Sequence, residues 1–166
     1  EDIYLITKLS NTDHNLNRAP AAIEKSLEQL GLDYIDLYLM HWPMAPSGLF
    51  VDIWRQFEEF KRPGLTRSIG ASNYRVVDLQ QILENTDIPP AVNQIELHPL
   101  FRQKELQEFA TQHGIVTQCW GPFGFTKHDM FAEPQIQEIA QRLKATPAQV
   151  LLRWYFQNEW AVVGKS

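Results

Sequence analysis

The chain has 166 residues, of which 44% are hydrophobic and 21% are charged. This is the composition of a soluble globular domain with one sizeable core. The formal net charge is −5 and the sequence has no block of basic residues, which argues against a nucleic-acid-binding surface. No apolar stretch approaches the ~18 residues of a membrane-spanning helix. The single cysteine, Cys119, excludes an internal disulfide framework and favours a cytoplasmic location.

Both ends of the sequence are abrupt. Glu1 and Asp2 lead straight into an apolar run with no initiator Met or signal peptide, and Lys165 and Ser166 directly follow a strand-like pair of valines. We therefore expect residues 1–166 to form a single domain that is truncated at both ends.

Strand-like and helix-like segments alternate along the chain. Segments rich in β-branched and aromatic residues predict six strands, at residues 3–8, 34–41, 65–72, 91–96, 115–120 and 160–164. Apolar stripes at helical spacing lie between them: Ile23, Leu27 and Leu30; Phe50, Trp54, Phe57 and Phe60; Leu79, Ile82 and Leu83; Leu106, Phe109 and Ala110; Ile136, Ile139, Ala140 and Leu143; Val150, Leu151 and Trp154. Thr146, Pro147 and Gln149 predict a capping box at the start of the last helix.

This alternation requires a parallel sheet, either a doubly wound sheet or a (β/α) barrel. The stretch 34–41 is almost continuously apolar, as expected of a strand that is buried on both faces of such a sheet. No G-x-G-x-x-G turn follows any predicted strand, which argues against the dinucleotide-binding doubly wound fold. We predict an α/β fold of the (β/α)8 TIM-barrel type, incomplete, with about six of the eight units present.

Each predicted strand ends on residues that could contact a ligand: Lys8, His41, Ser72 with Asn73, Gln94, Trp120, and Lys165 with Ser166. In a barrel these ends share one rim, where polar groups converge on a ligand. Each residue alone also has a structural interpretation, such as a solvated lysine, a core histidine, a helix cap or a buried amide. Six such ends in register favour a binding site.

Several motifs, in the same order along the chain, resemble those of the aldo-keto reductases. The matching stretches are residues 7–9, 32–43, 68–74, 92–99, 120–124, 146–154 and 165–166. They correspond to strands three to eight of that family's barrel. Trp120, where many members carry tyrosine, resembles the bacterial branch that includes the 2,5-diketo-D-gluconate reductases.

The resemblance implies reduction of an aldehyde or ketone, diketo sugar acids among the candidates, with NADPH as cofactor and NADH as the alternative. In that family a tyrosine donates the proton and a lysine paired to an aspartate lowers the pKa of the tyrosine, because a positive charge favours the phenolate. By motif the lysine is Lys8. His41 would orient the carbonyl, with Trp42 beside the substrate.

The resemblance also implies the cofactor site. Ser72, Asn73 and Gln94 would hold the nicotinamide carboxamide, and Trp120 would stack on the nicotinamide ring. The pyrophosphate would meet the backbone of the loop that contains Gly121, Phe123 and Gly124, and the adenosine 2′-phosphate would meet Lys165 and Ser166.

Departures from the family pattern leave an alternative open. The family's catalytic tyrosine and aspartate precede the Lys8 strand, and no tyrosine of this sequence matches their motif. Ala71, Gly121, Phe123 and Gly164 replace the usual residues and are expected to loosen cofactor binding. The chain could therefore be an inactive fragment or a cofactor-binding module. A Schiff-base role for Lys8 explains neither Asn73 nor Trp120. We expect no metal site and a monomeric parent protein.

Overall fold

The computed structural model describes residues 3–124 and 129–164. Its strands are β1 (Ile6–Leu9), β2 (Ile35–Met40), β3 (Thr66–Ser72), β4 (Val92–Glu96), β5 (Val116–Trp120) and β6 (Ala161–Val163). Its α-helices are α1 (Ala19–Leu30), α2 (Phe50–Lys61), α3 (Val76–Asn85), α4 (Lys104–Gln112), α5 (Pro134–Leu143) and α6 (Pro147–Gln157). Short 3-10 helices, which the sequence did not predict, occur at η1 (Asn11–Asp13), η2 (Ala45–Ser47) and η3 (Met130–Ala132).

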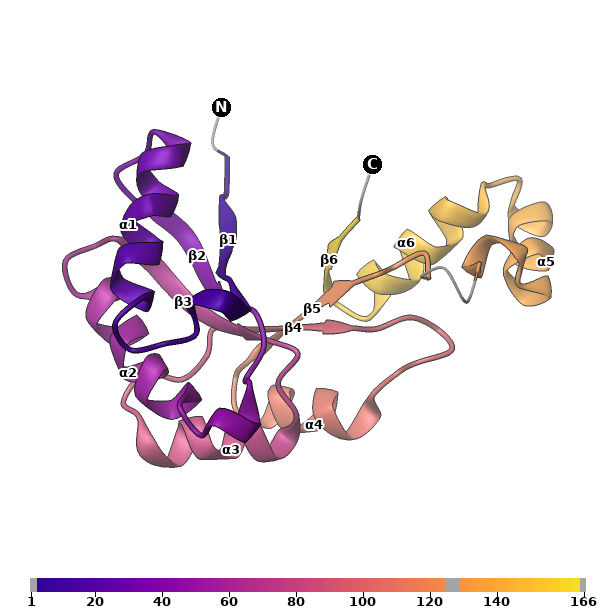
Figure 1. The fold of residues 1–166 in the computed structure, drawn as a ribbon. Helices are drawn as coiled ribbons and strands as arrows, with labels where there is room; N and C mark the ends of the chain where they lie inside the picture. Colours follow the sequence, from indigo (N-terminus) through magenta and orange to yellow (C-terminus); the bar gives the residue numbers. More distant parts are fainter. Residues whose placement is uncertain (1–2, 125–128, 165–166) are drawn as a thin grey trace.

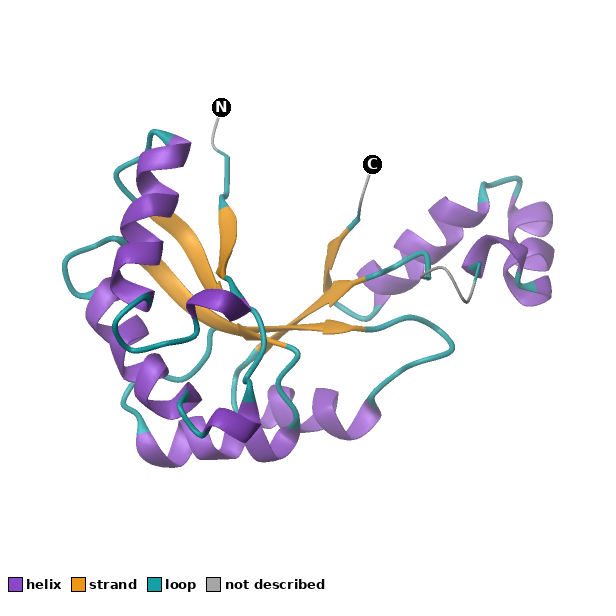
Figure 2. Cartoon of the chain, in the orientation of Figure 1, coloured by secondary structure: helices purple, strands orange, loops and turns teal. Residues whose placement is uncertain are grey.

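The strands form one parallel sheet in the order β1-β2-β3-β4-β5-β6, so each strand pairs with its neighbours in the chain. Figures 1 and 2 show that the sheet curls into an open trough, with the helices on its convex side. β1 and β6 are the two edges of the sheet in the described part of the chain. The predicted incomplete barrel is confirmed. None of the described helices is long and apolar enough to span a membrane.

The strand register sorts side chains onto two faces. Lys8 pairs with Leu39 and Leu39 with Gly70, and two residues farther along β3 Ser72 pairs with Gln94. Since paired residues and residues two apart share a face, the side chains of Lys8, Ser72 and Gln94 lie on the concave face. The residues between them on each strand face the helices.

The convex face of the sheet carries the main hydrophobic core. Tyr38 and Met40 of β2 are fully buried there, together with Ile53, Trp54 and Phe57 of α2. The Tyr38 and Phe57 rings stack with centroids 4.9 Å apart. A smaller cluster lies at the far end of the molecule, where α5 packs on α6. The concave face is therefore not needed to hold most of the helices in place.

Local sequence signals account for several element boundaries. The predicted capping box at Thr146 is confirmed: its hydroxyl accepts the Gln149 N–H, and the Gln149 side chain accepts the Thr146 N–H at 2.8 Å. Gly31 ends α1 with φ +65°, a left-handed conformation that glycine adopts without strain.

Gly70 of β3 has no room for a side chain. A Cβ placed on it would be 2.6 Å from Leu39 Cδ2 and 2.9 Å from the backbone oxygen of Val92. We expect Gly70→Ala to lower the free energy of unfolding by about 1–3 kcal/mol in urea titrations, because a backbone atom cannot move aside cheaply. Gly164→Ala is the matched control, since its Cβ would come no nearer than 3.7 Å to Phe123. Equal stability of the two variants would refute the steric argument.

His14 links the loop after β1 to the core. It is 9% exposed, its Nε2 lies 3.1 Å from Met40 Sδ, and burial lowers its pKa. Below about pH 6.5 the histidine binds a proton more readily in the unfolded protein than in the folded one. The free energy of unfolding should therefore decrease as the pH is lowered through this range. His14→Gln should flatten that fall in acid-to-neutral urea titrations, with the same substitution at the exposed His113 as the control. An unaltered profile in His14→Gln would contradict this assignment.

Candidate functional site

The ends of β1 and β2 bring Lys8 and His41 close together. Both side chains are half-buried. Burial lowers the pKa of Lys8. Burial also lowers the pKa of His41, and the positive charge of Lys8 lowers it further. His41 is consequently held neutral near pH 7, and a neutral imidazole can donate one hydrogen bond and accept another.

Asn73 connects three strand ends through its side-chain amide. Nδ2 donates to the His41 backbone oxygen at 3.0 Å and to Ser72 Oγ at 3.1 Å, and Oδ1 accepts the Trp120 indole N–H at 2.9 Å. Its φ is +61°, which turns the side chain away from the alternation of β3. Asparagine tolerates this conformation better than most residues. The amide predicted to hold a ligand thus also fixes the rim.

Polar side chains cross the concave face between β3 and β5. Ser72 Oγ donates to the Gln94 backbone oxygen at 3.0 Å, and Gln94 Nε2 donates to Gln118 Oε1 at 2.6 Å. All three residues are buried. Among the described residues these bonds leave one N–H and the carbonyl oxygen of the Gln94 amide without a protein partner. Gln94 can therefore offer a donor and an acceptor to one ligand.

Two cavities lie beside Trp42 and Asn73. One, of about 190 Å³, is lined by Trp42, Asn73 and Trp120 among others. The second, of about 510 Å³, shares Trp42 and Asn73 and extends along residues 43–46. The first is too small for a whole drug-sized ligand.

The loop after β5 contains the predicted phosphate-contacting residues. Gly121 and Gly124 both have positive φ, +65° and +83°, and the Gly124 N–H donates to the Gly121 oxygen at 3.0 Å. Tyr155 Oη of α6 lies 3.1 Å from the Pro122 oxygen and fixes the loop from the side of the helices. Phe123 packs in the small cluster with Met130 and Leu151. Lys165 and Ser166 lie outside the described residues.

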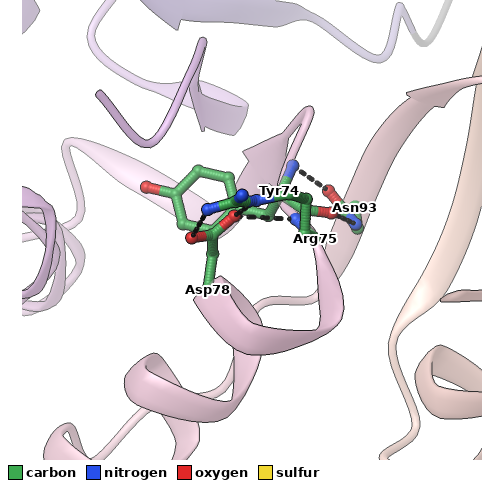
Figure 3. A network of polar contacts seen from close by, with 4 residues as sticks. All are labelled: Tyr74, Arg75, Asp78 and Asn93. Carbon is green, nitrogen blue, oxygen red and sulfur yellow. Dashed lines mark hydrogen bonds and ion pairs between the residues drawn. The ribbon is translucent and has the colours of Figure 1, made fainter. Parts of the chain in front are cut away.

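Sequence reasoning missed several residues that shape this rim. Gln118 lies inside β5, and only the sheet register reveals that it faces Gln94. Asn93 of β4 holds the backbone of Tyr74: its Nδ2 donates to the Tyr74 oxygen at 3.0 Å, and its Oδ1 accepts the Tyr74 N–H at 3.4 Å (Figure 3). Arg75 follows directly and lines both cavities. The signal that could have identified Arg75 in the sequence was its position directly after the motif at residues 68–74.

The arrangement fits a nicotinamide ring. A carboxamide needs one donor and one acceptor, which Gln94 has. An aromatic ring needs a flat wall, which Trp120 can offer, since it lies two residues beyond the Gln118 that Gln94 contacts. Within the described residues no group of three or more His, Cys, Asp or Glu side chains could hold a metal ion. Cys119 is buried, and burial raises the pKa of its thiol to about 12, so it is a poor nucleophile.

Comparisons with known proteins agree with this geometry. The family model described as "Aldo/keto reductase family" matches residues 1–166. An aldo-keto reductase of Mycolicibacterium smegmatis is 45% identical over 166 residues, and methylglyoxal reductase DkgA of Escherichia coli O157:H7 is 39% identical over 166 residues. These alignments cover 100% of this chain and 60% of each relative. The chain thus spans about three-fifths of the length of these relatives.

Solved structures show the same fold. An aldo/keto reductase from Brucella melitensis superposes with a TM-score of 0.93 at 41% identity, covering 99% of this chain and 62% of that one. A point mutant of Gox0644 in complex with NADPH gives a TM-score of 0.94 at 41% identity, covering 99% and 60%. With the family model matching from end to end, the chain belongs to the aldo/keto reductase family.

Proposed function

We propose that the protein carrying this chain is an NADPH-dependent carbonyl reductase that converts aldehydes or ketones to alcohols. The observation that carries the proposal is the joined rim, in which Lys8, His41, the Asn73 amide and Trp120 converge from four strand ends. Relatives described as a methylglyoxal reductase and as an NADPH complex support it. A reduced nicotinamide, when bound, supplies the hydride.

The residues of this chain would bind the cofactor, orient the substrate and polarise its carbonyl group. Gln94, with Ser72 beside it, would meet the carboxamide, and Trp120 would cover one face of the ring so that the other faces the substrate. His41, kept neutral, would donate a hydrogen bond to the carbonyl oxygen. Lys8 would stabilise negative charge as it develops on the oxygen. We also assign the loop at residues 121–124, with Lys165 and Ser166, to the cofactor phosphates.

The proton donor is proposed to come from outside residues 1–166. Tyr4 and Tyr34 are exposed but precede β1 and β2, so they lie at the end of the sheet opposite the rim. Tyr38, Tyr74 and Tyr155 are buried on the helix side, and burial raises the pKa of each hydroxyl far above its usual value. Such phenols hold their protons too tightly to act near pH 7. The relatives are longer than this chain, which leaves room for the donor in the rest of the protein. We retain a single barrel domain, a monomeric parent and a cytoplasmic location as proposals.

The second candidate is a cofactor-binding module without turnover. It is favoured by the same tyrosine geometry, because the described tyrosines are either buried or located at the amino ends of β1 and β2, away from the rim. The two candidates make different predictions for the chain alone and for the full-length protein.

We expect NADPH to quench the tryptophan fluorescence of the 166-residue chain, since Trp120 lies at the proposed ring site, and Trp120→Phe to remove most of that quenching. With NADPH and small aldehydes or ketones, the full-length protein should show a fall in absorbance at the reduced-nicotinamide band. Quenching without turnover by the full-length protein would favour the module. If NADPH caused no quenching and the full-length protein showed no turnover, both candidates would be refuted.

Removal of the Lys8 charge should act on His41 in a measurable way. Because that charge is the second cause of the low pKa of His41, Lys8→Met should raise the pKa of His41 in an NMR titration. It should also lower kcat of the full-length enzyme by about 100-fold, the scale of one electrostatic group in a water-poor site. Lys25→Met, an exposed change on α1, is the control for both measurements. An unmoved His41 pKa would show that the two groups do not interact.

A further inference from the structure

Gln118 of β5 lies on the concave face directly opposite Gln94 of β4. The two residues are paired in the parallel ladder between these strands, which lie side by side in the trough (Figure 1). Gln118 is 7% exposed and Gln94 is 3% exposed. Gln94 Nε2 donates to Gln118 Oε1 at 2.6 Å. This bond joins two buried amides, and the function proposed above leaves Gln118 without a role.

The bond to Gln118 fixes the orientation of the Gln94 amide. A glutamine amide can exchange the places of its oxygen and nitrogen by rotating, and both orientations fill nearly the same space, so hydrogen bonds select between them. Because Nε2 is held by Gln118, Oε1 of Gln94 is turned away from Gln118. Unlike the orphaned ring nitrogens of His14 and His98, this oxygen is not sealed from the surface. A ligand in the trough can therefore reach an acceptor at Gln94.

The other contacts of Gln94 hold its main chain and not its amide. Ser72 Oγ and the Asn73 N–H donate to the Gln94 backbone oxygen, at 3.0 and 2.9 Å. Within residues 3–124 and 129–164, Gln118 is the hydrogen-bond partner of the Gln94 side chain. Removal of the Gln118 oxygen would thus leave the main chain of β4 in place and free the Gln94 amide to rotate.

We propose that Gln118 is a positioning residue for the cofactor, which fixes Gln94 so that its Oε1 accepts an N–H of the nicotinamide carboxamide. This inference rests on the proposed function and adds to its site the residue that makes the site selective for a carboxamide. A fixed acceptor favours a ring substituent with an N–H group. It rejects a substituent that can only accept, because the buried Gln94 oxygen would then stay unpaired. Gln118 acts through Gln94 and needs no contact with the cofactor.

A purely structural role for the same bond predicts a different result. The main chains of β4 and β5 already pair from Val92 with Val116 to Glu96 with Trp120, so the side-chain bond is not needed to join the strands. If the bond only stiffened the sheet, its loss would weaken the binding of every ligand at the rim to the same extent. A role in orientation predicts instead a change in the choice between two ligands that differ at the carboxamide.

The test compares NADPH with its 3-acetylpyridine analogue, which keeps the carbonyl oxygen and carries a methyl group in place of the amide NH2. In calorimetric titrations of the full-length protein, we expect NADPH to bind about fivefold more tightly than the analogue, the scale of one net hydrogen bond. Gln118→Met should reduce that ratio to less than about twofold, because the freed Gln94 amide can rotate and donate to the analogue. Gln118→Glu should preserve the ratio, since a carboxylate oxygen still accepts the Gln94 N–H. Gln112→Met, an exposed change on α4, is the matched control.

The outcomes separate the inference from the proposed function. Equal binding of the two cofactors by the unaltered protein would overturn the inference, and so would an unchanged ratio in Gln118→Met or a lost ratio in Gln118→Glu. Because binding needs no turnover, a preference for NADPH that disappears only in Gln118→Met would support the inference even if no carbonyl were reduced, in which case the proposed function alone would fail. Carbonyl reduction by a protein that binds both cofactors equally would leave the proposed function standing without the inference. Failure to bind either cofactor would refute both.

Discussion

The rim depends on one amide side chain. Asn73 joins the ends of β2, β3 and β5 by donating to the His41 oxygen and to Ser72 and accepting from the Trp120 indole. It can do so only because its backbone is left-handed, at φ +61°. Asparagine adopts that conformation more readily than most residues do, and the neighbouring structure helps to hold it. Asn93 does this by bonding both backbone groups of Tyr74, where the β3–β4 ladder has ended at Ser72 and Gln94.

The convex face of the sheet carries the main hydrophobic core, and the concave face carries the candidate binding groups. The convex face carries the aromatic core around Trp54 and Phe57, which anchors α2 without help from the concave face. The concave face can therefore hold buried amides such as Gln94 and Gln118, which would cost stability if they lacked partners. That face is tightly packed at Gly70, because a single added carbon there would lie 2.9 Å from the backbone oxygen of Val92. A rigid support with polar groups facing one way is what ligand orientation requires.

The fold was predictable because its signals are local and repeated. Alternating strands and helices, the capping box at Thr146 and the strand ends at Lys8, His41 and Asn73 can all be read from short stretches. What could not be read depends on register or on contacts distant in sequence. Gln118 and Gln94 are 24 residues apart, and only pairing of β4 with β5 brings them together. Arg75 is an exposed charge at the start of α3, and only the structure shows that it lines a cavity together with Trp42 and Asn73.

The charges at this rim have different effects because they differ in burial. The centre consists of neutral groups, Ser72, Asn73 and Gln94, with Lys8 at one side and Arg75 in the adjoining cavity. Lys8 is half-buried, so its field reaches His41 with little screening and can stabilise charge that develops during a reaction. Arg75 is exposed, and water and salt screen its field beyond direct contact. A cation of that kind can favour a ligand by hydrogen bonding but cannot drive chemistry at a distance. Of the two cations, only Lys8 therefore acts measurably on a neighbouring group at this rim, the His41 imidazole.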